Sequence, residues 1–259
     1  MSLLPLLGSG AGSADSARPR QHDAMRHIAY LATLIPPHTF NPSSCATLLN
    51  VLLSHRAPTA QETDRDLRVY DHVRKALWAT PPGRLVPRNR AAVVALTACI
   101  AALAKLSRPL HAPADKKLLV ELATAVIKGR RSWLITPHVL ATVANSLSKA
   151  GVRDVPVLRS IALAVRGSAR ADMQARDCAL LLNAFAQLSL IDEPLLTLLG
   201  ERLLHVDRGQ HTLQSLSLAL HALATLGPDA LAPGLHQQVM AQLLAAVRQV
   251  PSALLRPLP

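Results

Sequence analysis

Hydrophobic and polar residues follow the spacing of amphipathic α-helices along most of the chain. In residues 139–147 and 180–188, apolar side chains recur at positions i, i+3, i+4 and i+7, which places them on one face of a helix. Each segment stops at a short turn and is followed by a second apolar segment with helical spacing, at residues 157–165 and 195–204. The pattern therefore predicts pairs of consecutive helices.

The two predicted pairs repeat in sequence, because residues 143–158 align without a gap on residues 181–196. The matched positions are Asn145 with Asn183, Leu147 with Phe185, Asp154 with Asp192, Pro156 with Pro194 and Leu158 with Leu196. A third copy puts His221 at the position of Asn183, before its match slips by one residue. A period of roughly 20 to 50 residues is the signature of repeat architectures. We therefore predict an all-α fold, an α-solenoid of antiparallel helical hairpins with a repeat of about 38 residues.

The predicted turns share a composition. They contain Gly151, Ser189 or Gly227, followed by an aspartate and then by a proline. Proline suits the first position of a helix, since its missing N–H would have no partner there. The turns therefore predict where the second helix of each pair begins.

Pattern and composition divide the chain into five parts. They are an N-terminal tail (1–22), an irregular helical part (23–80), a basic connector (81–90), the regular array of helical hairpins (91–250) and an extended C-terminal tail (251–259). Further helices are predicted at residues 24–34, 45–54, 64–79, 91–107, 115–128 and 235–247. The N-terminal tail is rich in glycine, serine and arginine, which suits either a flexible segment or an organelle-targeting segment.

Composition supports a helical core. Half of the 259 residues are hydrophobic but only 2% are aromatic, so leucine, alanine and valine must supply the packing. Such small aliphatic residues suit closely packed helices better than a β-sandwich. Cys45, Cys99 and Cys178 lie far apart in apolar segments and are predicted to be reduced, buried thiols. The longest apolar runs are about 14 residues, short of the roughly 20 that cross a bilayer, so the chain is not expected to span a membrane.

The net charge of +12 is unevenly distributed. Residues 1–171 contain 23 basic and 9 acidic residues, whereas residues 172–259 contain 5 basic and 7 acidic residues. A basic region of this size favours a polyanionic partner, most often a nucleic acid. Arginine enrichment without such a partner is the alternative explanation.

The basic connector and its neighbours supply the candidate RNA contacts. Three connector arginines have no acidic neighbours in sequence, and the KGRR motif at residues 128–131 lies close to Trp133, which could stack a base but is more often a core residue. The predicted RNA-binding residues are Arg84, Arg88, Arg90, Lys116, Lys117, Lys128, Arg130, Arg131, Lys149 and Arg153.

Polar residues at equivalent repeat positions allow two interpretations. Asn145, Asn183 and His221 could line a concave surface and contact bases, as in other helical-repeat RNA binders. Alternatively, an asparagine between apolar neighbours could bond the backbone of an adjoining turn. We favour this structural role for Asn145 and Asn183, whereas the residues one turn later (Lys149, Gln187 and Thr225) fit either role.

The sequence contains none of the common catalytic or metal-binding motifs. There is no HExxH, no Walker-type loop, no G-x-S-x-G and no cysteine and histidine cluster at ligand spacing. The 11 histidines are scattered and are predicted to be surface or capping groups, among them His138, His205, His211 and His221. We therefore expect a non-enzymatic protein without a cofactor or a small-molecule substrate.

The repeats resemble a known family. LLNAFAQLSLIDEPLLTLLGERLL and VANSLSKAGVRDVPVLRSIA are similar to heptatricopeptide and octotricopeptide repeats, and to the related repeats of FAST-kinase-domain and RAP-domain proteins. Those units read approximately L-x-N-x-x-W-A-x-A-K-L-G-x-x-D. Here the tryptophan position holds Ser146, Ala184 and Ala222, and the final glycine is kept only as Gly151 and Gly227.

The resemblance covers residues 91–250 well and residues 24–79 loosely. It implies an α-solenoid of organelles that acts on mitochondrial or chloroplast RNA, or that is built into an organellar ribosome. We therefore expect a mitochondrial protein, with a plastid as the alternative location. Its expected partners are RNA, above all ribosomal RNA, and neighbouring proteins of a large ribonucleoprotein complex. The competing hypothesis is a protein scaffold or accessory subunit of an organellar complex without RNA contact.

Overall fold

The computed structural model describes residues 27, 29–54, 60–106, 113–129, 135–168, 173–206 and 210–249. All regular secondary structure in these residues is helical, so the prediction of an all-α protein is confirmed. The α-helices are α2 (Pro42–Ser54), α3 (Ala60–Ala79), α4 (Pro82–Leu85), α5 (Arg90–Leu106), α6 (Pro113–Lys128), α7 (Pro137–Lys149), α8 (Val155–Gly167), α9 (Ala175–Gln187), α10 (Glu193–His205), α11 (Leu213–Leu226) and α12 (Leu235–Arg248). Two short 3-10 helices, η1 (Pro37–Thr39) and η4 (Pro228–Ala230), accompany them.

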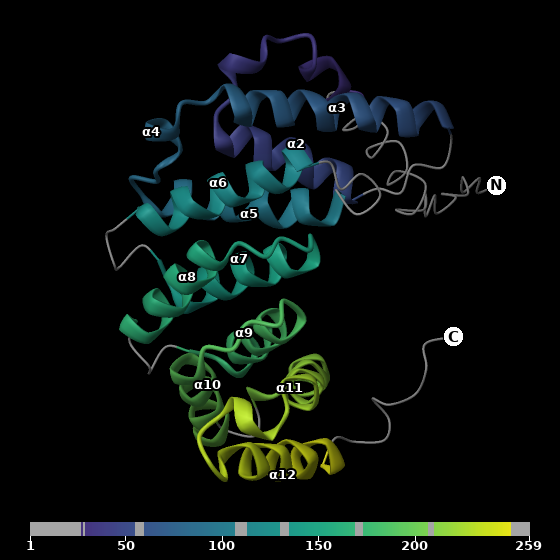
Figure 1. The fold of residues 1–259 in the computed structure, drawn as a ribbon. Coiled ribbons are helices and arrows are strands. Elements are labelled where there is room, and N and C mark those ends of the chain that lie inside the picture. Colours follow the sequence, from purple (N-terminus) through teal and green to yellow (C-terminus); the bar gives the residue numbers. More distant parts are fainter. Residues whose placement is uncertain are drawn as a thin grey trace, which may run out of the picture.

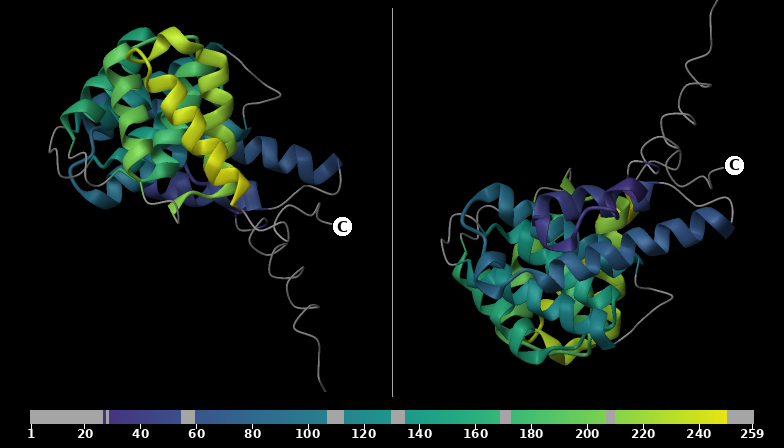
Figure 2. Two further views of the ribbon diagram at one scale, coloured as in Figure 1. Left: turned by 90° about the horizontal axis from the view of Figure 1, so that it is seen from below. Right: turned by 90° about the horizontal axis from the view of Figure 1, so that it is seen from above.

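The helices contact one another in two series. Helices α2, α5, α7, α9 and α11 pack in succession, and so do α6, α8, α10 and α12. Consecutive helices of the chain, such as α7 with α8 and α9 with α10, connect the two series. Figure 1 shows the resulting stack, which runs from α2 and α3 at one end to α12 at the other, and Figure 2 shows α3 extending beyond the other helices.

The sequence repeat coincides with helix boundaries. Helices α7, α8, α9 and α10 each have 13 residues. The bounds of α9 and α10 are those of α7 and α8 shifted by one repeat. Helix α11 keeps this spacing at its first residue, Leu213, but α12 begins only at Leu235, because η4 occupies the connection.

The turns after α7 and α9 have the same backbone hydrogen bonds. The N–H of Val152 donates to the carbonyl of Leu147 at 2.9 Å, and the N–H of Leu190 donates to the carbonyl of Phe185 at 3.0 Å. Between these partners, Gly151 has φ 63° and Ser189 has φ 50°. A bond of this type across a left-handed residue is the Schellman ending of a helix. The predicted turns therefore lie where the glycine and serine pattern placed them.

An aspartate starts the helix after each of these turns. Asp154 accepts a hydrogen bond from the N–H of Val157 at 3.0 Å, and Asp192 accepts one from the N–H of Leu195 at 3.1 Å. Each aspartate caps an N–H that has no partner within the helix. The following proline is the second helical residue rather than the predicted first, since α8 begins at Val155 and α10 at Glu193.

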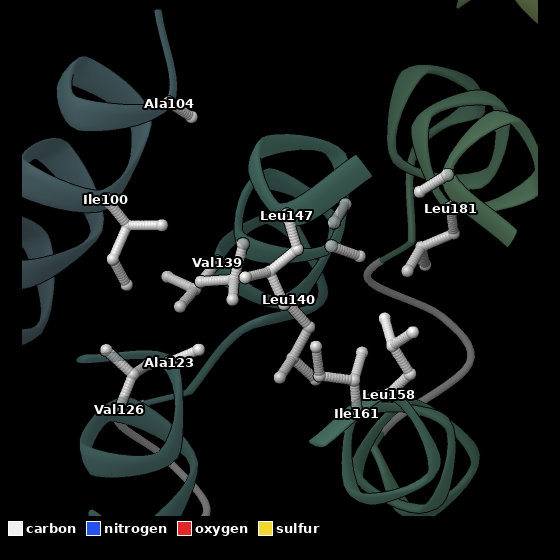
Figure 3. Close-up of a cluster of buried hydrophobic side chains, with 14 of the residues drawn as sticks. Ile100, Ala104, Ala123, Val126, Val139, Leu140, Leu147, Leu158, Ile161 and Leu181 are labelled. Carbon is white, nitrogen blue, oxygen red and sulfur yellow. The ribbon is translucent and has the colours of Figure 1, made fainter. Parts of the chain in front are cut away.

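Aliphatic side chains from both helix series form one core (Figure 3). Leu147 of α7 and Ile161 of α8 are fully buried, and so are Ile100 of α5 and Leu181 of α9. Cys45, Cys99 and Cys178 are buried free thiols, as predicted. Removal of these apolar side chains from water is the main force that holds neighbouring helices together.

The predicted helices 45–54, 64–79 and 115–128 begin earlier in the structure, at Pro42, Ala60 and Pro113. Two of these helices start at a proline, which the first turn accommodates without loss of a hydrogen bond. Only part of the predicted helix 24–34 and none of the two predicted tails lies in the described residues. No helix in the described ranges is long and apolar enough to cross a membrane.

Candidate nucleic-acid interface

The connector at residues 81–90 is largely exposed but is anchored by two buried side chains. It contains α4, and the side chains of Leu85 and Pro87 are buried. Helix α4 contacts α6, and a Cβ atom added to Gly129 would lie 2.7 Å from Cγ of Pro87. The buried apolar side chains thus anchor the connector against α6.

This anchoring fixes two of the predicted arginines at the surface. Arg84 and Arg88 are exposed and flank Leu85 and Pro87 in the chain. The backbone N–H of Arg84 donates to the carbonyl of Pro81 at 2.8 Å, which holds the turn of α4. Both arginines line an open cavity of about 780 Å³, which we call the α4 cavity.

The α4 cavity lies where two longer helices begin. Its lining includes Asn41 and Asn89, which cap α2 and α5. The Oδ1 atom of Asn41 accepts from the N–H of Ser44 at 2.9 Å, and that of Asn89 accepts from the N–H of Ala92 at 2.8 Å. A helix N-terminus has a partial positive charge, which adds to the charge of the two arginines. The lining contains no aspartate or glutamate among the described residues.

One arginine of α3, Arg74, has a different environment. Arg74 donates to Asp71 at 2.6 Å and to the buried Asp115 of α6 at 3.3 Å. Hydrogen bonds from Lys75 and Arg74 lower the pKa of Asp71 despite the opposing effect of burial. Arg74 is therefore neutralised by carboxylates, whereas Arg84 and Arg88 form no ion pair with any described residue.

Three predicted lysines lie on α6, next to the connector. Lys117 is exposed, and its Nζ atom lies 5.5 Å from the ring centre of Trp78, a cation–π distance. Lys116 is half-buried and Lys128 is exposed. Trp78 is 37% exposed.

The other predicted contacts are distributed differently. Arg90 is the exposed first residue of α5, and Lys149 is the exposed last residue of α7. Arg153 is exposed, but its Nη2 atom also donates to the carbonyl of Ser189 at 3.2 Å, which links two successive turns. Arg130, Arg131 and the neighbouring Trp133 lie outside the described residues. The structure thus brings Arg84 and Arg88 to one cavity beside the lysine-bearing α6, whereas Lys149 and Arg153 belong to the next helix pair.

The repeated polar positions do not form a uniform surface. Asn183 is 3% exposed, Asn145 is half-buried, and His221 is exposed. Asn183 is thus buried, but its Oδ1 atom has no hydrogen-bond partner in the described residues, so the predicted bond to an adjoining backbone is not seen. Gln187 accepts a hydrogen bond from Ser148 Oγ at 2.6 Å, which joins α9 to α7. Thr225 donates to the carbonyl of His221 in its own helix at 2.8 Å.

One interaction between helix pairs was not predicted. His138 Nδ1 lies 2.9 Å from Oδ1 of Asp177, so that α7 and α9 are also linked near their first turns. Asp177 is 2% exposed. The two residues are 39 positions apart in sequence, close to the repeat length. This spacing could have indicated that they lie next to each other in adjacent helix pairs.

The described residues contain no group of three or more histidine, cysteine or acidic side chains that could hold a metal ion. Comparison with protein-family models, curated proteins and solved structures found no match for this chain. Function is therefore inferred from the residues and geometry of this molecule.

Proposed function

We propose that the protein is a non-catalytic RNA-binding α-solenoid, built from helical hairpins with a repeat of about 38 residues. The proposed solenoid is supported by the equal lengths and shifted bounds of α7–α8 and α9–α10, and by the two contact series. We propose that it is a structural component of the mitochondrial ribosome, or a factor for its assembly. The ribosomal role rests on the repeat resemblance and on the basic N-terminal two-thirds, and a plastid remains the alternative location.

The main support for RNA binding is the composition of the α4 cavity. Two exposed arginines line it, no carboxylate of the described residues lines it, and buried side chains of the same segment hold it in place. Cationic side chains bind a phosphate backbone by releasing its counterions, independently of base sequence. The lysines of α6 would extend this contact, since α4 packs against that helix.

The C-terminal part suits a different partner. Residues 172–259 have 5 basic and 7 acidic residues. A nearly neutral surface offers little attraction to a phosphate backbone, so this part favours protein contacts over RNA contacts. We therefore assign this end to neighbouring proteins of a ribonucleoprotein complex. The same observation favours the second candidate function, a protein scaffold without RNA.

Sedimentation of the native protein from a mitochondrial extract tests the proposal. The protein should travel with a ribosomal subunit through a sucrose gradient, and RNase treatment or magnesium removal should shift it to lighter fractions. If it stays in a smaller complex that RNase does not change, the scaffold function replaces the RNA-binding function. If plastid extracts alone contain it, the location changes but the RNA test is repeated there.

A further inference from the structure

The α4 cavity has the volume of a site for a small ligand. Small-molecule sites are concave and span about 300 to 1,000 Å³, and the cavity of about 780 Å³ falls in this range. A base in an RNA duplex is stacked and paired, so a duplex offers its backbone to a protein surface. An unpaired nucleotide can project into a cavity.

The polar atoms that line the cavity are suited to an anion. Arg84 and Arg88 supply guanidinium groups, which match phosphate oxygens in geometry. The Oδ1 atoms of Asn41 and Asn89 are occupied by helix capping, so the amide NH₂ groups are the remaining polar groups of these two side chains. An amide NH₂ group donates hydrogen bonds, which suits acceptor oxygens of a phosphate or of a base.

An aromatic residue also lines the cavity. Phe40 lines it and is partly buried against the core. Its ring meets the ring of His72 edge to face, with centres 5.3 Å apart and planes at 84°. A phenylalanine beside cationic residues is the combination by which proteins hold single-stranded RNA, because the base stacks on the ring while the phosphate meets the charge.

We propose that the α4 cavity binds one unpaired nucleotide of an RNA strand, with the phosphate at Arg84 and Arg88 and the base against Phe40. This inference rests on the proposed RNA-binding function and gives it a specific site. It means that the protein recognises single-stranded segments or bulges and not regular duplex.

Fluorescence anisotropy with the full chain tests the site. The probes are a fluorescein-labelled 12-nucleotide uridine RNA, the same strand with abasic positions, and a 12-base-pair RNA duplex. The test variant is R84Q/R88Q. Its matched control is R159Q/R176Q, which removes the same charge from two exposed arginines on α8 and α9, outside the cavity.

We expect the wild-type chain to bind the single strand more tightly than the duplex. R84Q/R88Q should weaken single-strand binding about tenfold, and the slope of log affinity against log salt should become shallower by roughly 0.7 for each phosphate that is no longer bound. R159Q/R176Q should change binding less than threefold. Phe40→Leu should weaken binding to the uridine strand about fivefold or more, as expected for loss of base stacking, and should leave binding to the abasic strand unchanged.

Distinct outcomes separate the two proposals. If the wild-type chain binds none of the probes, the proposed function itself fails. If it binds RNA but R84Q/R88Q equals its control, or if duplex binds more tightly than the single strand, the cavity proposal alone is overturned. Free uridine 5′-monophosphate that competes at the same concentration as the RNA would also overturn it, in favour of a mononucleotide site. If circular dichroism shows that Phe40→Leu does not fold, base stacking is tested with the wild-type chain alone. Tighter binding of the uridine strand than of the abasic strand supports base stacking, and equal binding contradicts it.

Discussion

Gly151 and Ser189 occupy the same position in two successive turns, one repeat apart. Both have left-handed backbone torsions, with φ of 63° and 50°. Each lies two residues after the end of a helix of 13 residues. The next residue, Val152 or Leu190, donates the backbone hydrogen bond that closes the turn. Both positions therefore require a left-handed backbone conformation, which glycine adopts more readily than serine.

Ser189→Gly is expected to stabilise the protein. Left-handed torsions cost a residue with a Cβ atom about 1 kcal/mol or more, whereas glycine adopts them readily. The free energy of unfolding should rise by about 1 kcal/mol, measured by urea denaturation followed by circular dichroism. Gly151→Ser is the reciprocal variant and should reduce the free energy of unfolding by a similar amount. Equal stability of wild type and both variants would contradict the left-handed torsions.

Gln174→Thr is expected to stabilise the start of α9. Gln174 has φ −83° and ψ 158°, nearly the torsions of the equivalent Thr136 (φ −84°, ψ 159°), but its side chain forms no capping hydrogen bond. Thr136 caps α7 through Val139, and Thr212 caps α11 through Ser215. A threonine at position 174 should form the missing bond and add about 0.5 to 1 kcal/mol of stability. A valine at this position, equal in shape but without the hydroxyl, is the control and should give no gain.

A double-mutant cycle should detect coupling between Ser148 and Gln187. Their side chains form a 2.6 Å hydrogen bond between α7 and α9, and Ser148 is 8% exposed. We expect Ser148→Ala and Gln187→Ala to interact by about 0.5 to 1.5 kcal/mol, since each single variant already removes the bond. Thermal melts of the four proteins provide the measurement. Purely additive effects would mean that this bond does not join the two helices in solution.

The buried cysteines should react slowly with thiol-specific reagents. Burial raises the pKa of Cys45 and Cys178 to about 12 from an ordinary value of 9.0, and it raises the pKa of Cys99 further. The thiolate is the reactive form, so native protein at pH 8 should show little reaction with Ellman's reagent, and denatured protein should react at all 3 cysteines. Because the raised values favour the neutral thiol in the folded state, their contribution to stability is present below pH 9 and declines above it. Rapid reaction of native protein at pH 8 would show that the described core opens.

The regular part of the fold could be predicted because its signals are local. Asp154 and Asp192 mark helix starts by their side-chain chemistry, and Gly151 marks a helix end by its torsion. The register of the repeat followed from these marks. The helix predicted at residues 235–247 is confirmed as α12 (Leu235–Arg248), although it begins later than the repeat alone would place it, after η4 and the turn that follows η4.

The candidate site was predicted only in part, because its geometry depends on contacts distant in sequence. Arg84 and Arg88 were named from their lack of acidic neighbours, but Phe40 and Asn41 meet them only after the chain has folded. The burial of Leu85 and Pro87 depends on contacts with α6 and Gly129, which lie beyond the whole of α5 in the sequence. The contact between Trp78 and Lys117 likewise joins two helices distant in sequence and has no local signal.

The shift by one whole repeat between α7–α8 and α9–α10 has a consequence for chain length. If residues 155–192 were removed, Asp154 would precede Glu193 and Pro194, and the order of cap, helix start and proline would be unchanged. In the proposed solenoid, whole units could therefore be added or removed without a change in the turn residues. The number of units would then set the distance between the arginine-lined cavity near one end and the nearly neutral surface at the other.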